Sequence, residues 1–269
     1  MLGKLLKHEW LSTAKRLLPC FFIEAGLTIL FICTQLFFQY MQRTSNTPEY
    51  SVHSLFFSGI LLSILYFICF VTLFINTVIL VCRFFASMVG SESYLTHTLP
   101  VKTSELLLSK FLNALAWLIL SGAAALFFML LCFGATQGFS KIRDFIQSDL
   151  FYEILDLISG EKQWSFFALI IFFVSLLIFG IWQVIASIAL GQLMEKHRAL
   201  CSVAFYFVIS TIRQIVFSIV NIAIFNVEKI MIQNNFISFY SIYAILYLSL
   251  AAGLYFLSLH IFSKHLNLE

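Results

Sequence analysis

The chain has 269 residues with a formal net charge of +3, and 61% of its residues are hydrophobic whereas only 11% are charged. Soluble domains average roughly 45–50% apolar and about 25% charged residues, so the composition excludes an ordinary soluble domain, and we expect no nucleic-acid partner. Several stretches of about 20 or more mainly apolar residues are each long enough to cross a bilayer as a helix. We therefore predict an all-α, polytopic membrane helical bundle in contact with lipid.

Residues 1–16 have the pattern of an amphipathic helix. Apolar side chains recur at helical spacing while basic side chains occupy the other side: Leu2, Leu5, Leu6, Trp10, Ala14 and Leu17 against Lys4, Lys7, His8 and Lys15. The pattern predicts an interfacial helix with its lysines near anionic headgroups. The apolar stretch that follows is too long for a signal peptide and lacks a cleavage pattern, so we expect it to be retained as the first span.

Six spans follow in one transmembrane domain, residues 17–269. Their predicted ranges are 17–40, 55–82, 106–133, 165–193, 200–225 and 236–262. A polar loop, 84–105, joins the second span to the third. Residues 139–162 carry an apolar stripe at a period of 3.6 residues, which predicts an amphipathic helix along the bilayer surface or capping the bundle.

The orientation follows from the positive-inside rule. One set of faces holds ten basic residues: Lys4, Lys7, Lys15, Arg16, Arg83, Lys102, Lys110, Lys196, Arg198 and Lys264. The opposite faces hold five: Arg43, Lys141, Arg143, Lys162 and Lys229. Both termini, the interfacial helix and the 84–105 loop are therefore expected in the cytoplasm, and the 139–162 helix outside.

The 84–105 loop mixes apolar and polar side chains. Ser91 and Glu92 resemble a helix start, and Pro100 ends whatever helix or turn begins there. The next helix is expected to begin at Thr103 or Ser104. Apolar side chains on a short cytoplasmic element suit docking on another protein, and they equally suit folding back onto the bundle.

A family resemblance favours docking. The run Gly90-Ser-Glu-Ser-Tyr-Leu-Thr-His-Thr-Leu-Pro-Val101 resembles the first cytoplasmic loop of ATP-binding-cassette type-2 exporter permeases of Gram-positive bacteria. Leu5-Leu-Lys-His-Glu-Trp10 resembles the opening of the same permeases. Six spans with both ends inside also match, which implies a multi-pass protein of a bacterial plasma membrane.

The resemblance implies a mechanism. Two permease subunits, identical or similar, pair, and each loop docks as a coupling helix into a separate cytoplasmic ATPase that binds ATP and Mg. The implied coupling residues are Glu92, Tyr94, Leu95, His97, Leu99 and Pro100. In better-known members the external segment between spans five and six forms re-entrant helices; here that segment is short, and the cargo, whether peptide, lipid or drug, stays open.

Ionisable residues inside spans are candidates for function because hydrocarbon penalises them. Glu24 lies in the first span and Arg213 in the fifth. They could pair only across tilted helices, and separate partners are an equal alternative. For Arg213, a substrate- or dimer-facing role and structural hydrogen bonding both stay open, and Gln183 is either interhelical glue or part of a path.

The sequence contains no recognisable catalytic motif. It has no phosphate-cradling Gly-x-x-x-x-Gly-Lys-Ser/Thr run and no His-Glu-x-x-His pair, and its histidines form no ligand cluster. We therefore expect no catalytic residue, no metal site and no cofactor bound by this chain. The alternatives are a membrane-embedded sensory or interaction subunit that relays a signal to a cytoplasmic partner, and, more weakly, a secondary transporter, for which repeats and broken spans are missing.

Overall fold

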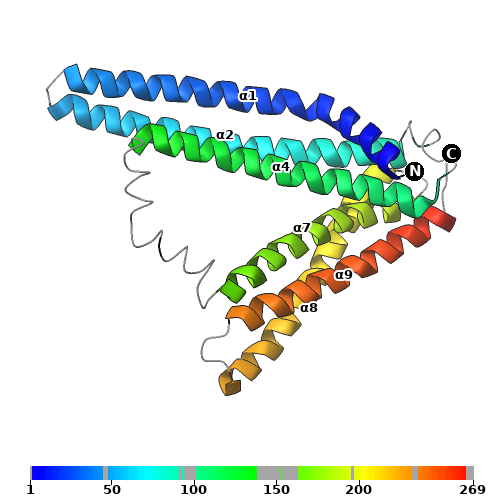
Figure 1. The fold of residues 1–269 in the computed structure, drawn as a ribbon. Coiled ribbons are helices and arrows are strands. Elements are labelled where there is room, and N and C mark those ends of the chain that lie inside the picture. The colour runs from blue at the N-terminus through cyan, green and yellow to red at the C-terminus, as the bar shows by residue number, and fades with distance from the viewer. Residues whose placement is uncertain are drawn as a thin grey trace. The chain divides into compact units, whose positions relative to one another are not determined.

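A computed structural model describes residues 2–44, 48–90, 93, 101–137, 152, 163–194, 197–231 and 236–264. These residues form six helices and no strand (Figure 1). The helices are α1 (Leu2–Thr44), α2 (Pro48–Met88), α4 (Thr103–Gln137), α7 (Gln163–Gly191), α8 (Arg198–Met231) and α9 (Phe236–Lys264).

All six helices are long and apolar enough to cross a membrane. The prediction of an all-α, six-span helical bundle is therefore confirmed. α4 begins at Thr103, as predicted, because the Lys102 carbonyl accepts the first backbone hydrogen bonds, from Glu105 and Leu106. The predicted external helix 139–162 lies, except for Tyr152, outside the described residues.

α1 is one continuous helix of 43 residues, with Pro19 inside it. The predicted interfacial helix, 1–16, and the predicted first span, 17–40, are parts of this single element. The expected faces are present, since the basic residues Lys4, Lys7, His8 and Lys15 are exposed, whereas the predicted apolar positions are buried or half-buried: Leu2, Leu5, Leu6, Trp10, Ala14 and Leu17. Which part of α1 lies at the membrane surface stays a prediction.

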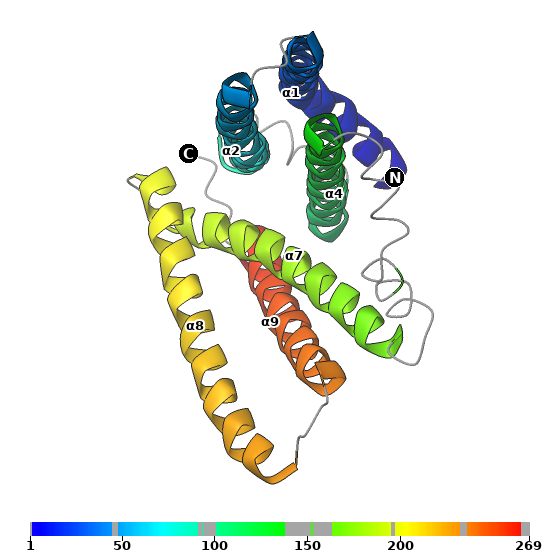
Figure 2. The ribbon, with the colours of Figure 1, turned by 90° about the vertical axis from the view of Figure 1, so that its left-hand side faces the viewer.

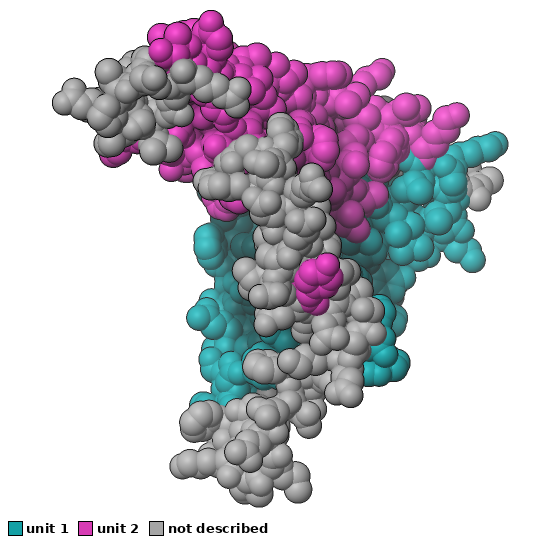
Figure 3. Space-filling model, turned by 60° about the vertical axis from the view of Figure 1, so that its left-hand side comes forward, with its two compact units in different colours: residues 1–6, 81–115, 155–269 teal, residues 7–80, 116–154 magenta. Residues whose placement is uncertain are grey.

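The described chain divides into two compact units, coloured in Figure 3. Unit 1 contains residues 1–6, 81–115 and 155–269, and unit 2 contains residues 7–80 and 116–154. Each unit includes part of α2 and part of α4.

Unit 2 is a bundle of α1, α2 and α4, which lie side by side in Figures 1 and 2. Two apolar clusters hold the three helices together. Leu17, Leu80 and Trp117 form one, with Trp10 stacked on Trp117 at a ring-centroid distance of 4.5 Å. Phe31, Leu65 and Cys132 form the other. Each cluster takes one residue from each helix, so the bundle is closed at two levels along its length.

In unit 1, α7 packs against both α8 and α9. The helices meet largely through aromatic rings: Phe179 of α7 lies 5.4 Å from Tyr247 of α9, and Phe217 of α8 lies 4.5 Å from the same ring. At the end of α7, Gly191 lies so close to α8 that an added Cβ would sit 2.0 Å from Ser202 Oγ. Only glycine therefore permits this approach.

Candidate functional site

The predicted coupling residues come from the segment between α2 and α4. Glu92, Tyr94, Leu95, His97, Leu99 and Pro100 all lie outside the described residues. Ser93, in the middle of the segment, is described and is buried. The structure describes in detail the C-terminus of α2 and the N-terminal part of α4, which lie on either side of the segment. We call these two helix ends, together with the end of α7, the base of the segment.

The C-terminus of α2 is closed by backbone hydrogen bonds. The amides of Val89 and Gly90 both donate to the Phe85 carbonyl, at 2.9 and 3.0 Å. A Cβ on Gly90 would lie 3.0 Å from the backbone of Ala86, so a small residue suits this close turn. The Gly90 carbonyl accepts a further hydrogen bond, from the Ser93 amide, at 3.0 Å.

Two buried side chains tie α2 to its neighbours at this base. The Lys110 ammonium of α4 donates to Ser87 Oγ of α2 at 2.7 Å. Gln192, directly after α7, donates through Nε2 to the Met88 carbonyl at 3.3 Å. Both donors are buried. Since a buried polar group costs free energy unless it is hydrogen-bonded, these contacts hold the ends of α2, α4 and α7 at one level.

Two residues of this region were not expected from the sequence to be buried contacts. Lys110 was counted as a basic residue at a cytoplasmic face, which stays a prediction, and the structure adds that its side chain is buried. Gln192 went unnoticed. Its only sequence signal is a polar residue directly after Gly191 at the end of an apolar run.

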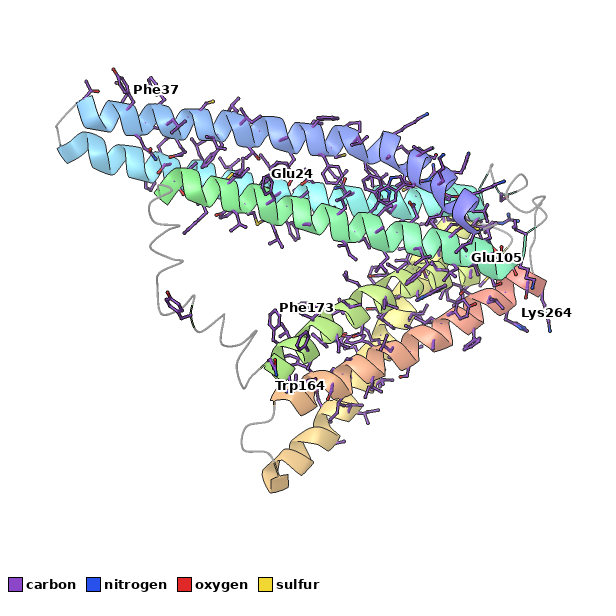
Figure 4. All side chains as sticks on the ribbon, viewed as in Figure 1. Glu24, Phe37, Glu105, Trp164, Phe173 and Lys264 are labelled. Carbon is purple, nitrogen blue, oxygen red and sulfur yellow. The ribbon has the colours of Figure 1, made fainter. Side chains whose placement is uncertain are left out.

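Glu24 faces the interior of unit 2, and Figure 4 labels it on α1. Its carboxyl group contacts the side chains of Cys69 and Thr72 on α2. Thr28, one turn further along α1, donates to the Glu24 carbonyl at 2.8 Å. The side-chain oxygen Oε1 has no hydrogen-bond partner among the described residues.

A polar section therefore separates the two apolar clusters of unit 2. Along α1, Glu24 lies midway between Leu17 and Phe31, the α1 members of the two clusters. Along α2, Thr72 and the buried Asn76 lie between Leu80 and Leu65. Glu24 is the one charged residue among the described buried residues of this unit. The section has the composition of an intramembrane polar site, which is normally buried in protein because hydrocarbon disfavours it.

Arg213 on α8 lies at the contact with α7 and is half-buried. Its guanidinium carbon is 5.8 Å from the centroid of the Phe179 ring, within the range of a cation–π interaction. The same guanidinium donates to Ser210 Oγ at 3.4 Å. Both partners of the Arg213 guanidinium therefore belong to the α7–α8 helix pair.

Gln183 lies at the same helix pair. It is buried, and its Nε2 donates to the Tyr206 carbonyl of α8 at 3.3 Å. Because α7 and α8 run antiparallel, the Gln183–Tyr206 contact and the Phe179–Arg213 contact are successive levels of one interface. The structure thus brings Gln183 and Arg213 to the same helix pair, while Glu24 belongs to the other unit.

Among the described residues, no group of three His, Cys, Asp or Glu side chains is placed to hold a metal ion. Comparison with protein-family models, with curated proteins and with solved structures finds no match.

Proposed function

We propose that this chain is the membrane permease subunit of an ATP-driven exporter. In this proposal a separate cytoplasmic ATPase of the ATP-binding-cassette class hydrolyses ATP with Mg, and the permease passes an amphipathic cargo across a bacterial plasma membrane. The chain pairs with a second permease subunit, and it contributes no catalytic residue of its own.

One observation carries the proposal. The segment that resembles a coupling loop, Gly90–Val101, joins α2 to α4, and the helix ends on both sides of it are held by buried side chains. A docking element transmits force only if its base is stiff, and the Lys110–Ser87 and Gln192–Met88 bonds make this base stiff. Because Gln192 comes from the end of α7, a push on the segment reaches α7 as well.

The test is capture of the partner from native membranes. The wild-type chain, solubilised in mild detergent, is purified beside the variant Tyr94→Ala/Leu95→Ala, and co-purifying ATP hydrolysis is measured. We expect an ATPase with the wild type and at least a tenfold loss with the variant, since apolar anchors dominate such interfaces.

A matched control is Leu193→Ala/Met194→Ala. These two exposed apolar residues follow α7, on the face predicted to be cytoplasmic, and lie outside the coupling segment. This variant is expected to keep the ATPase. Absence of an ATPase from the wild type, or equal retention by the Tyr94/Leu95 variant, would contradict the proposal.

The second candidate is a membrane-embedded subunit that relays a signal to a cytoplasmic partner without moving a solute. The observation that favours this relay is the position of the buried polar section around Glu24. It lies inside a closed three-helix bundle and therefore forms no path for a cargo by itself. The same capture distinguishes the two functions: a partner that is lost with the Tyr94/Leu95 variant and does not hydrolyse ATP supports the relay.

A further inference from the structure

The polar section of unit 2 contains a carboxyl group without a counter-charge. Between the two apolar clusters the helices supply residues 17–31 of α1, 65–80 of α2 and 117–132 of α4, all of which the structure describes. Glu24 is the one charged residue in these three stretches. The other titratable groups there are thiols and a phenol, which carry no positive charge in any protonation state: Cys20, Tyr66, Cys69 and Cys132. An ionised Glu24 is therefore not balanced by the three helices around it.

The polar section is also short of hydrogen-bond donors. The hydroxyl groups of Thr28, Thr72 and Ser121 all donate to backbone carbonyls of their own helices, at 2.8, 2.9 and 3.1 Å. Each hydroxyl has a single hydrogen, so its oxygen has only lone pairs left to offer. The Thr72 side chain nevertheless contacts the Glu24 carboxyl group. Apart from the weak donor Cys69, this contact brings two acceptors together unless a positive species lies between them.

Two acceptor oxygens of the polar section have no hydrogen-bond partner among the described residues. They are Glu24 Oε1 and Asn76 Oδ1, and their side chains are only 3% and 2% exposed. Asn76 follows Thr72 by one helical turn, on the face of α2 that carries Leu65 and Leu80, so it points into the same bundle interior. Buried oxygens without partners cost free energy, and a species that accepts their lone pairs removes this cost.

We infer that the polar section binds one monovalent cation between Glu24, Thr72 and Asn76. A single positive charge balances the one carboxylate, and hard cations take oxygen ligands. The cation is either a proton on the carboxyl group, which then donates to Thr72 Oγ1, or a sodium ion coordinated by the oxygens. A divalent ion would leave a net positive charge in the bundle interior, which is costly. The inference rests on unit 2 alone and holds for either proposed function.

The first test is chemical labelling of Glu24 in native membranes. A hydrophobic carbodiimide reacts with a carboxyl group only when the group is protonated, and mass spectrometry locates the adduct. We expect an adduct at Glu24 whose rate of formation falls by about tenfold per pH unit once the proton is lost. Glu24→Gln, which has no carboxyl group at this position, is the control.

Replacement of choline chloride by sodium chloride at constant pH distinguishes the two cations. Slower labelling in sodium chloride identifies a bound sodium ion, because the ion and the proton compete for the same carboxylate. An unchanged rate of labelling identifies the proton as the ligand.

Thermal unfolding in detergent is a second readout, which does not depend on the reagent reaching the bundle interior. A native state that holds a proton released on unfolding loses stability as the pH rises, because it binds more protons than the unfolded state. In choline chloride the unfolding midpoint of the wild type should therefore fall with pH relative to that of Glu24→Gln. If sodium is the ligand, sodium chloride should raise the wild-type midpoint, since a ligand of the native state alone stabilises it.

A matched pair of variants tests the neutral oxygens. Thr72→Val removes one of them and should shift the dependence of the midpoint on pH or on sodium. Thr77→Val, at an exposed position of the same helix, should leave this dependence unchanged. The same pH and sodium dependence in the wild type and in Glu24→Gln would overturn the inference, and a bound water would then be the partner of the two oxygens.

Discussion

The ammonium group of Lys110 lies 2.7 Å from the hydroxyl oxygen of Ser87, and both side chains are buried where the predicted coupling segment begins and ends. The contact joins α2 to α4 within unit 1. The proposed function requires a rigid connection between α2 and α4 next to the coupling segment, and this hydrogen bond lies there.

Ser87→Ala removes the acceptor and leaves the buried ammonium short of one hydrogen bond. The cost of an unsatisfied buried polar group is about 1–3 kcal/mol, and more for a charged one, so we expect a lower free energy of unfolding. Titration with a denaturing detergent measures it. Ser63→Ala is the control, because Ser63 is exposed and bonds only within its own helix; an equal loss in both variants would contradict the prediction.

The ATPase activity that co-purifies with the Ser87→Ala protein should also fall, because the ends of α2 and α4 next to the coupling segment are held less rigidly. If unfolding stability drops while the ATPase is retained at the wild-type level, Lys110–Ser87 is a structural contact only.

Gly191→Ala should destabilise the turn from α7 to α8. The new Cβ would lie 2.0 Å from Ser202 Oγ and 2.8 Å from the Ser202 backbone nitrogen, and backbone cannot move aside as a side chain can. Overpacking of this kind costs about 1–3 kcal/mol. Thermal unfolding in detergent should show a lower midpoint, while Gly180→Ala, where an added Cβ meets nothing within 4 Å, should leave the midpoint unchanged.

Glu24→Gln should keep or raise the stability of unit 2. The carboxyl group contacts only neutral side chains, Cys69 and Thr72, and the described buried residues of this unit include no basic side chain. An uncharged amide of nearly the same shape removes the cost of burying a charge. A fall of more than about 1 kcal/mol in the free energy of unfolding would show a counter-charge instead.

Arg213 and Phe179 should be energetically coupled. A double-mutant cycle with Arg213→Met and Phe179→Leu is expected to give a coupling of about 0.5–2 kcal/mol, the range of a cation–π contact. A cycle of Arg213→Met with Phe205→Leu, on the same helix but two turns away, is the control. Zero coupling between Arg213 and Phe179 would leave the charge free for a substrate-facing role.

Local hydropathy was enough to predict the six helices. A single apolar segment can satisfy its backbone hydrogen bonds within itself in a membrane only as a helix. The lengths of the apolar runs alone therefore place α7 and α9 within two residues of their observed bounds. The start of α4 followed from Pro100 and Glu105 in the same local way. The amphipathic faces of residues 1–16 could also be predicted, because the alternation of basic and apolar side chains is a local sequence signal.

The partners of the intramembrane polar residues were decided by tertiary structure. Glu24 meets Cys69 and Thr72, Gln183 meets Tyr206, and Gln192 meets Met88, all over separations of more than twenty residues. Helices that are apolar nearly all round carry little periodicity to mark their packing face. The sequence by itself therefore predicts six helices that are long and apolar enough to cross a membrane, whereas only the packing of the helices decides that the Lys110 side chain is buried.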